Sequence, residues 1–127
     1  MTRAIADTSI FVAQEAGRKL GPIPDEVGVS VITAAELELG VLRATDDEVR
    51  ALRLATLSRV RSTFPLLAVD PETSSFFARL ANAALSEGRK LRRHDTWIAA
   101  TALRHDAVVL TQDRDFSKFE EVDVILA

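Results

Sequence analysis

Short apolar runs alternate along the chain with longer segments in which apolar residues recur at helical spacing. The short runs predict strands at residues 3–6, 27–31, 66–69, 107–111 and 122–126. The segments between them predict helices at residues 7–16, 33–41, 46–64, 70–87 and 95–105. Strands that alternate with helices are typical of α/β proteins. We therefore expect a central, mostly parallel sheet of four to five strands, flanked by helices.

The helix predicted after Asp70 has the clearest sequence signals. Pro71 suits the first turn of a helix, and apolar residues from Phe77 to Leu85 keep the i, i+3, i+4 spacing of a buried stripe. Gly88 is a typical residue just beyond a helix end. This segment therefore predicts one amphipathic helix that packs against the sheet.

Composition limits the class of protein and the chemistry available to it. The chain has 127 residues, of which 47% are hydrophobic and 28% charged, and we take residues 1–127 as one globular domain. It has no cysteine and only two histidines, so a metal site must depend on oxygen ligands. Apolar runs are too short to span a membrane, and Asp7 comes too early for a signal peptide. We therefore expect a cytoplasmic protein with no membrane partner.

Charge is unevenly distributed along the chain. The net charge of −3 argues against a protein that wraps nucleic acid by its overall charge. A basic run nevertheless precedes the last predicted helix, at Arg89, Lys90, Arg92 and Arg93. Arginine side chains suit phosphate binding. A solvated loop at a helix end, or an arginine bias in genome composition, explains the same run without any ligand.

Acidic residues stand next to the predicted strand ends. Asp7 follows the first strand, Glu36 lies in the first turn of the helix after the second, Asp95 begins the last helix, and Asp113 follows the strand 107–111. Ligand sites of α/β sheets form at the carboxyl ends of strands, so these residues are expected to meet at one rim. Clustered carboxylates repel one another unless a cation compensates them, and oxygen ligands favour magnesium or manganese over zinc.

Each acidic residue also has a simpler interpretation when taken singly. Asp7, Asp70 and Asp95 all precede helical segments, where aspartate is a favoured N-cap. Asp113 lies in the turn-like sequence Gln-Asp-Arg-Asp, and Glu36 fits an exposed helix position. The prediction of a metal site therefore depends on the joint pattern.

Four short motifs carry a resemblance to a known family. They occur in this order: Ile5-Ala6-Asp7-Thr8-Ser9, the segment 30–37 (SVITAAEL) with Gly40, the segment 95–102 (DTWIAATA), and the segment 110–116 (LTQDRDF). The series resembles the PIN-domain ribonucleases, specifically the VapC toxins of bacterial toxin–antitoxin pairs. The resemblance spans nearly the whole chain and implies the PIN-like three-layer sandwich.

The resemblance also implies roles for individual residues. The four acidic positions of the family fall on Asp7, Glu36, Asp95 and Asp113, and Asp115 matches a fifth position that is used less uniformly. These residues are expected to hold one or two Mg²⁺ or Mn²⁺ ions. The neighbouring hydroxyl groups expected to support them belong to Thr8, Ser9 and Thr111.

The partners implied by the resemblance are RNA, an antitoxin and a second copy of the chain. The basic run Arg89, Lys90, Arg92 and Arg93 is expected to contact the RNA backbone. A cognate VapB-type antitoxin is expected to place a basic side chain at the carboxylates, its segment lying in a groove. Candidate groove residues are Phe11, Val12, Leu37 and Leu39. The family also implies a homodimer.

Two alternatives to the toxin interpretation stay open. A housekeeping RNA-processing nuclease of the same superfamily would share the site and lack an antitoxin. A non-catalytic, receiver-like signalling module would also have an acidic pocket. The sequence disfavours the module, because the mid-chain strand leads only to Asp70 at the head of a helix. The lysine that such modules carry late in the chain is also missing from the turn Thr111-Gln112-Asp113.

Overall fold

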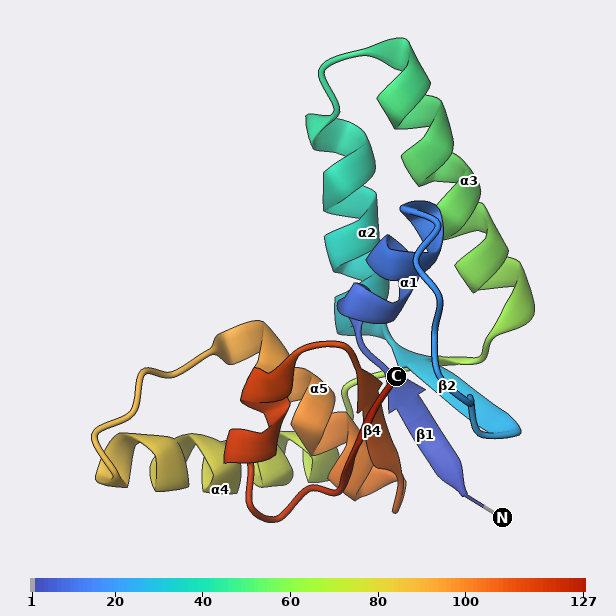
Figure 1. Ribbon diagram of the computed structural model, residues 1–127. Coiled ribbons are helices and arrows are strands. Elements are labelled where there is room, and N and C mark those ends of the chain that lie inside the picture. The colour runs from blue at the N-terminus through green and yellow to red at the C-terminus, as the bar shows by residue number, and fades with distance from the viewer. Residues whose placement is uncertain (1) are drawn as a thin grey trace.

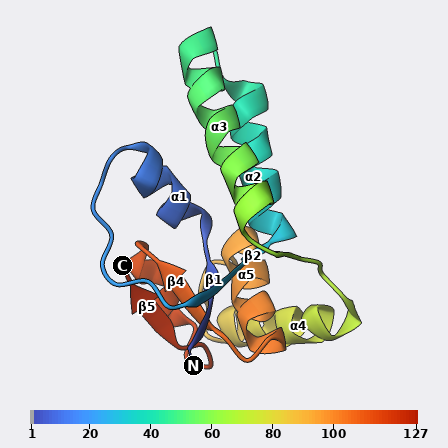
Figure 2. The same cartoon turned by 90° about the vertical axis from the view of Figure 1, so that its right-hand side faces the viewer.

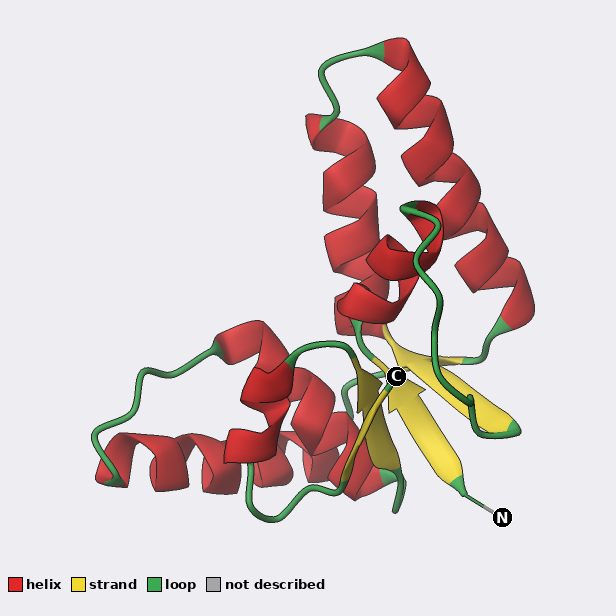
Figure 3. Ribbon diagram, in the orientation of Figure 1, coloured by secondary structure: helices red, strands yellow, loops and turns green. Residues whose placement is uncertain are grey.

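The computed structural model describes residues 2–127 and is built around a parallel sheet (Figure 3). Its strands are β1 (Arg3–Ala6), β2 (Glu26–Ser30), β3 (Leu66–Leu67), β4 (Val108–Thr111) and β5 (Val124–Leu126). They lie in the order β3-β2-β1-β4-β5, and every neighbouring pair is parallel. After β1 the chain builds one side of the sheet, and with β4 it moves to the other. The boundary between β1 and β4 is thus the switch point at which α/β sheets form ligand sites.

Helices cover both faces of this sheet. They are α1 (Thr8–Glu15), α2 (Val31–Arg43), α3 (Asp47–Thr63), α4 (Pro71–Ser86), α5 (Arg93–Arg104) and the short 3₁₀ helix η1 (Arg114–Lys118). In Figure 2, α1 lies on one side of the strands, and α4 and α5 lie on the other. In Figure 1, α2 runs away from the sheet and α3 returns beside it, so the pair projects as a helical hairpin. The predicted three-layer α/β fold with a mostly parallel sheet is confirmed.

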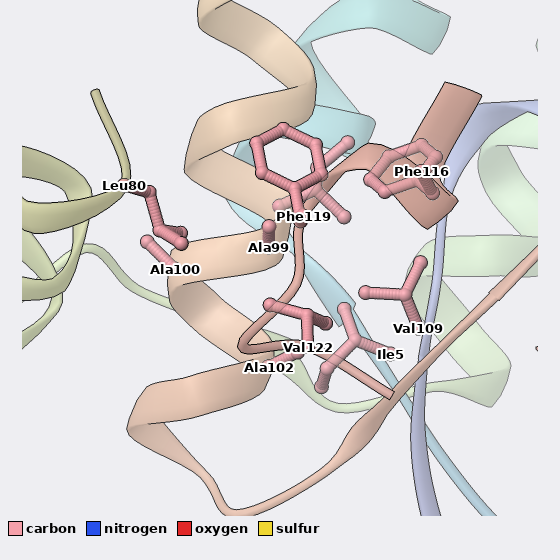
Figure 4. Packing of buried hydrophobic residues seen from close by; sticks show 10 residues of the cluster. Ile5, Leu80, Ala99, Ala100, Ala102, Val109, Phe116, Phe119 and Val122 are labelled. Carbon is pink, nitrogen blue, oxygen red and sulfur yellow. The ribbon is translucent and has the colours of Figure 1, made fainter. Parts of the chain in front are cut away.

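The core has two parts because successive strand residues face opposite sides of the sheet. Ile5 and Val109 pack with Leu80 of α4 and Ala99 of α5 (Figure 4). On the opposite face, the buried cluster draws on β1, β2, β4, α1 and α3, and consists of Ala4, Ala6, Ile10, Phe11, Val29, Val60 and Leu110. The sheet is therefore buried on both faces, as parallel sheets require.

Helix α4 begins and ends at the residues that the sequence signals. Asp70 forms a capping box with Thr73, and Pro71 is the first helical residue. Hydrogen bonds from the backbone and side chain of Thr73, together with contacts to Arg104, lower the pKa of Asp70 to about 2. Gly88 has φ of +70°, which suits glycine just beyond a helix end. The cap interpretation of Asp70 is confirmed.

Several predicted boundaries differ from the structure. Strand β3 stops at Leu67, and β5 starts at Val124. The Ser30 side chain accepts a hydrogen bond from the Ile32 amide at 3.0 Å, so α2 begins directly after β2. This earlier start places Glu36 in the second turn of α2, not in the first. Within residues 2–127, no helix has both the length and the apolar character needed to cross a membrane.

A carboxylate site at the switch point of the sheet

Asp7 stands at the carboxyl end of β1 and is almost completely buried, with 4% of its surface exposed. Its amide donates to the carbonyl of Leu110 at 3.0 Å, which holds it beside β4. One carboxylate oxygen accepts from the amide and the hydroxyl of Ser9, at 3.1 and 2.6 Å. The other accepts from the Thr111 hydroxyl at 2.9 Å. Asp7 is therefore both the N-cap of α1 and part of a network that joins two strands.

Two hydroxyl groups bind the ends of β1 and β4 together. The Ser9 hydroxyl, which donates to Asp7, accepts from the Gln112 amide at 2.9 Å. The Thr111 hydroxyl, which also donates to Asp7, accepts from the Asp113 amide at 2.9 Å. Thr111 thus fixes the orientation of one acidic side chain and the backbone of another. Ser9 and Thr111 thus contact the acidic residues, and the supporting role expected of their hydroxyl groups stays a prediction.

Glu36 joins this region from α2. Its Oε1 accepts from the hydroxyl of Thr8, the first residue of α1, at 2.8 Å. Its Oε2 lies 3.4 Å from Nδ1 of His94, an exposed residue in the first turn of α5. The Thr8 hydroxyl therefore orients Glu36 across the space between the first two helices.

The other acidic residues converge on one guanidinium group. Arg92 Nε lies 3.1 Å from Oδ2 of Asp95, and Arg92 Nη2 lies 3.5 Å from Oδ2 of Asp113. The remaining guanidinium nitrogen of Arg92 contacts Asp115. Helix α5 starts at Arg93, so Asp95 lies in its first turn and is not its N-cap as one interpretation had it. Arg92 supplies the positive charge that three neighbouring carboxylates need.

The pKa values of these residues move in opposite directions. Burial raises the pKa of Asp7 to about 6, against the hydrogen bonds from Ser9 and Thr111, and the charge of Asp95 adds to the rise. Burial also raises the pKa of Asp95 despite Arg92, with further rises from Asp113 and Glu36. The hydrogen bond from Arg92 and the charge of Lys118 lower the pKa of Asp115. These mutual effects place the acidic residues in one electrostatic neighbourhood.

The donor set fits a hard divalent cation chemically, although the side chains are not arranged around one. Asp7 receives only neutral donors, so its buried charge has no full counter-charge of its own. Yet in the part of the chain that the structure describes, no three acidic or histidine side chains come close enough to hold an ion. Arg92 instead occupies the space between Asp95, Asp113 and Asp115.

The expected groove residues are only partly placed as predicted. Val12 and Leu37 line a hollow of about 240 Å³ whose wall includes Glu36. Phe11 was wrongly expected there, because it is 1% exposed and packs on the ring of Phe64, 5.6 Å between centroids. Leu39 is exposed but lies outside this hollow. Of the four candidate groove residues, only Val12 and Leu37 therefore line the hollow beside Glu36.

The basic run ends at the start of α5, and its members have different contacts. Arg92 points into the carboxylates, whereas Arg89 pairs with Glu87 at 2.8 Å, and Lys90 and Arg93 are exposed. Sequence reasoning missed Lys118, which lies 3.5 Å from Asp115. The spacing from residue 115 to 118, one turn of η1, is the only sequence signal that could have indicated it.

Comparisons with known proteins agree with the fold. The PIN domain family model matches residues 4–122. Ribonuclease VapC5 of Mycobacterium tuberculosis is 43% identical over 118 residues, covering 91% of this chain and 87% of that protein. Ribonuclease VapC4 of the same organism is 41% identical over 128 residues, covering 97% and 95%.

Solved structures agree with the sequence relatives. The crystal structure of VapBC-5, a member of the VapBC family of toxin–antitoxin systems from Mycobacterium tuberculosis, superposes with a TM-score of 0.88. The two chains are 39% identical, and the match covers 100% of each. The chain described here therefore belongs to the PIN-domain family, among its VapC ribonucleases.

Proposed function

We propose that this protein is the toxin of a type II toxin–antitoxin pair and hydrolyses RNA phosphodiester bonds as a Mg²⁺- or Mn²⁺-dependent endoribonuclease. The observation that carries the proposal is the electrostatic coupling of Asp95 to Asp7, Glu36 and Asp113 beside the switch point of the sheet. The names of the relatives, which are ribonucleases, and the toxin–antitoxin complex among the solved structures support it. The proposed unit is the single domain 1–127.

Metal binding is assigned to the carboxylates. Asp7, Asp95 and Asp113 are the principal ligands, and Glu36 and Asp115 complete the set. One or two bound ions would supply Lewis-acid stabilisation of the phosphate and a water of lowered pKa.

The chain's own residues prepare this chemistry. The hydroxyl groups of Ser9 and Thr111 fix both oxygens of Asp7 in place. The Thr8 hydroxyl holds one oxygen of Glu36, and the other oxygen lies 3.4 Å from Nδ1 of His94. Such fixed orientation lowers the reorganisation needed during the reaction.

Two surfaces are assigned to partners. RNA approaches the carboxylates past Arg89, Lys90, Arg92 and Arg93, whose charges offset the repulsion between phosphate and carboxylate. A VapB-type antitoxin occupies the hollow beside Glu36, lined by Val12 and Leu37, and brings a basic side chain to the carboxylates. We assign the protein to the cytoplasm as a homodimer.

Induced expression of the wild type and of Asp95→Asn tests this function. Asp95→Asn keeps the size of the side chain and removes the charge. We expect the wild type to arrest growth and to produce RNA fragments with mapped 5′-phosphate ends, and Asp95→Asn to do neither. The matched control is Asp25→Asn, which removes a charge from an exposed loop position and should behave as the wild type.

Each alternative predicts a different result. Arrest by both proteins would indicate action by binding and would contradict catalysis. RNA cleavage without growth arrest, from a gene with no antitoxin neighbour, would indicate a housekeeping nuclease.

A further inference from the structure

A cavity of about 500 Å³ lies beside the carboxylate site. Its walls come from the end of α4, the segment before α5, and η1. Arg92 and Asp115 belong both to this cavity and to the carboxylate site, so the cavity adjoins that site. We call it the basic cavity, after its cationic lining residues Arg89, Lys90, Arg92 and Lys118.

Charge in the basic cavity contrasts with that of the whole chain. Its lining has four basic side chains and a single carboxylate, Asp115, in a protein of net charge −3. Arg92 and Lys118 both pair with that carboxylate. Arg89 pairs with the exposed Glu87, and among the described residues Lys90 forms no ion pair. The excess of positive charge favours an anionic ligand.

Size and wall chemistry narrow the choice of ligand. Pockets of about 300 to 1,000 Å³ accept small organic molecules, and 500 Å³ is ample for one nucleotide. Phe119 supplies an apolar wall, held in place by the ring of Phe116 at 5.8 Å between centroids. A suitable ligand has a phosphate that contacts the cationic side chains and an apolar face that packs against the ring of Phe119.

We propose that the basic cavity binds one nucleotide of the RNA strand, adjacent to the phosphate that is cleaved, with its phosphate against Lys118 and Arg89. This inference rests on the proposed ribonuclease function and adds a defined subsite to it. The subsite includes Arg89 and Lys118 but not Arg93, because Arg93 lines a different hollow beside Glu36 and His94.

Binding of a fluorescent single-stranded RNA to the full chain tests the subsite. All variants carry Asp95→Asn, so that RNA is not consumed. Lys118→Ala and Arg89→Ala are each expected to weaken binding about 5- to 10-fold, and to reduce the slope of log K against log salt by about 0.7. Lys118→Arg should restore most of the affinity. The matched control, Lys19→Ala, lies in the exposed segment after α1 and should change neither quantity.

Other results would contradict the subsite. If the wild type cleaves RNA but Lys118→Ala and Arg89→Ala bind as Lys19→Ala does, the subsite is wrong and the ribonuclease function stands. A loss confined to Arg93→Ala would also overturn it and assign the RNA path to the other hollow. If no protein of the set binds RNA and the wild type does not cleave it, both proposals fall. Equal melting temperatures ensure that a loss of affinity is not a loss of fold.

Discussion

The carboxylate site has two halves that hold the same type of side chain by different means. The inner half consists of Asp7, Ser9 and Thr111, and the outer half consists of Asp95, Asp113, Asp115 and Arg92. In the inner half, neutral hydroxyl and amide groups hold a buried aspartate whose pKa rises to about 6. In the outer half, a guanidinium group lowers the pKa of Asp115.

This difference separates orientation from charge compensation. Neutral donors fix the oxygens of Asp7 but leave its buried negative charge only partly stabilised. Arg92 compensates charge in the outer half, where the side chain of Asp115 is 43% exposed, although burial still raises the pKa of Asp95. A bound cation would therefore stabilise the inner half more, because the outer half already contains the guanidinium group of Arg92. Four predictions test this distinction.

The largest expected effect is the loss of catalysis in Asp7→Asn. Asparagine is also a good N-cap, so α1 should persist while the charge of the inner half disappears. We expect RNA cleavage to fall by roughly three orders of magnitude, because several kcal/mol of transition-state stabilisation depend on this ligand. A quenched fluorescent RNA substrate with Mn²⁺ measures the rate. Activity of Asp7→Asn within tenfold of the Asp25→Asn control would refute the role of the inner half.

The same substitution should stabilise the fold in the presence of a chelator. Between the ordinary pKa of 3.8 and about 6, the folded protein holds a proton on Asp7 that the unfolded chain has lost. Stability therefore falls as pH rises through this window, and the full cost, about 3 kcal/mol, applies above it. Urea unfolding at pH 7.5 should show Asp7→Asn as the more stable protein by up to that amount. The difference should shrink towards pH 4, and a constant difference would contradict the assignment.

Thr111→Val tests the hydroxyl that joins the two halves. Valine keeps the shape of the side chain but neither donates to Asp7 nor accepts from the Asp113 amide. We expect Mn²⁺ affinity to fall about 10- to 100-fold in titration calorimetry. Thr101→Val is the matched control, since its buried hydroxyl donates to the Trp97 carbonyl within α5, away from the carboxylates. Equal metal affinity in both variants would show that Thr111 has only a packing role.

The smallest expected effect concerns the outer half. Arg92→Ala removes the guanidinium from between Asp95, Asp113 and Asp115, so their repulsion is left for a metal ion to relieve. We expect Mn²⁺ to bind roughly fivefold more tightly, together with lower stability in chelator. Arg61→Ala is the control, because it breaks an exposed pair with Glu38 elsewhere. Weaker Mn²⁺ binding in Arg92→Ala would mean that Arg92 supports the metal site and does not compete with it.

Much of this fold and part of the site follow from the sequence. The positions of Asp7 and Asp113 could be predicted because they lie one and two residues after apolar strands, and parallel strands bring their carboxyl ends to one edge. Asp70 could be placed as a cap because Pro71 and the apolar spacing after it mark a helix start. Strand ends and helix starts of this kind depend on a few neighbouring residues and on the spacing of apolar residues along the chain.

Contacts across the fold could not be predicted in the same way. The position of Arg92 depends on the path of the chain between α4 and α5, and residues 87–92 have no periodic pattern. Phe11 was a candidate groove residue only because it is an apolar residue of the first helix, and its burial depends on a contact with Phe64 at the end of α3. The basic cavity needs η1 beside α5, and no sequence signal indicated that 3₁₀ helix.

Arg92 also has a consequence for the order of events after synthesis. A protein whose acidic residues depended on metal to neutralise them would fold only where the ion is plentiful. Here a counterion for Asp95, Asp113 and Asp115 is encoded in the chain itself. We therefore expect the newly made protein to reach its folded shape regardless of the supply of ions. Folding and activation then become separate steps in the life of the molecule.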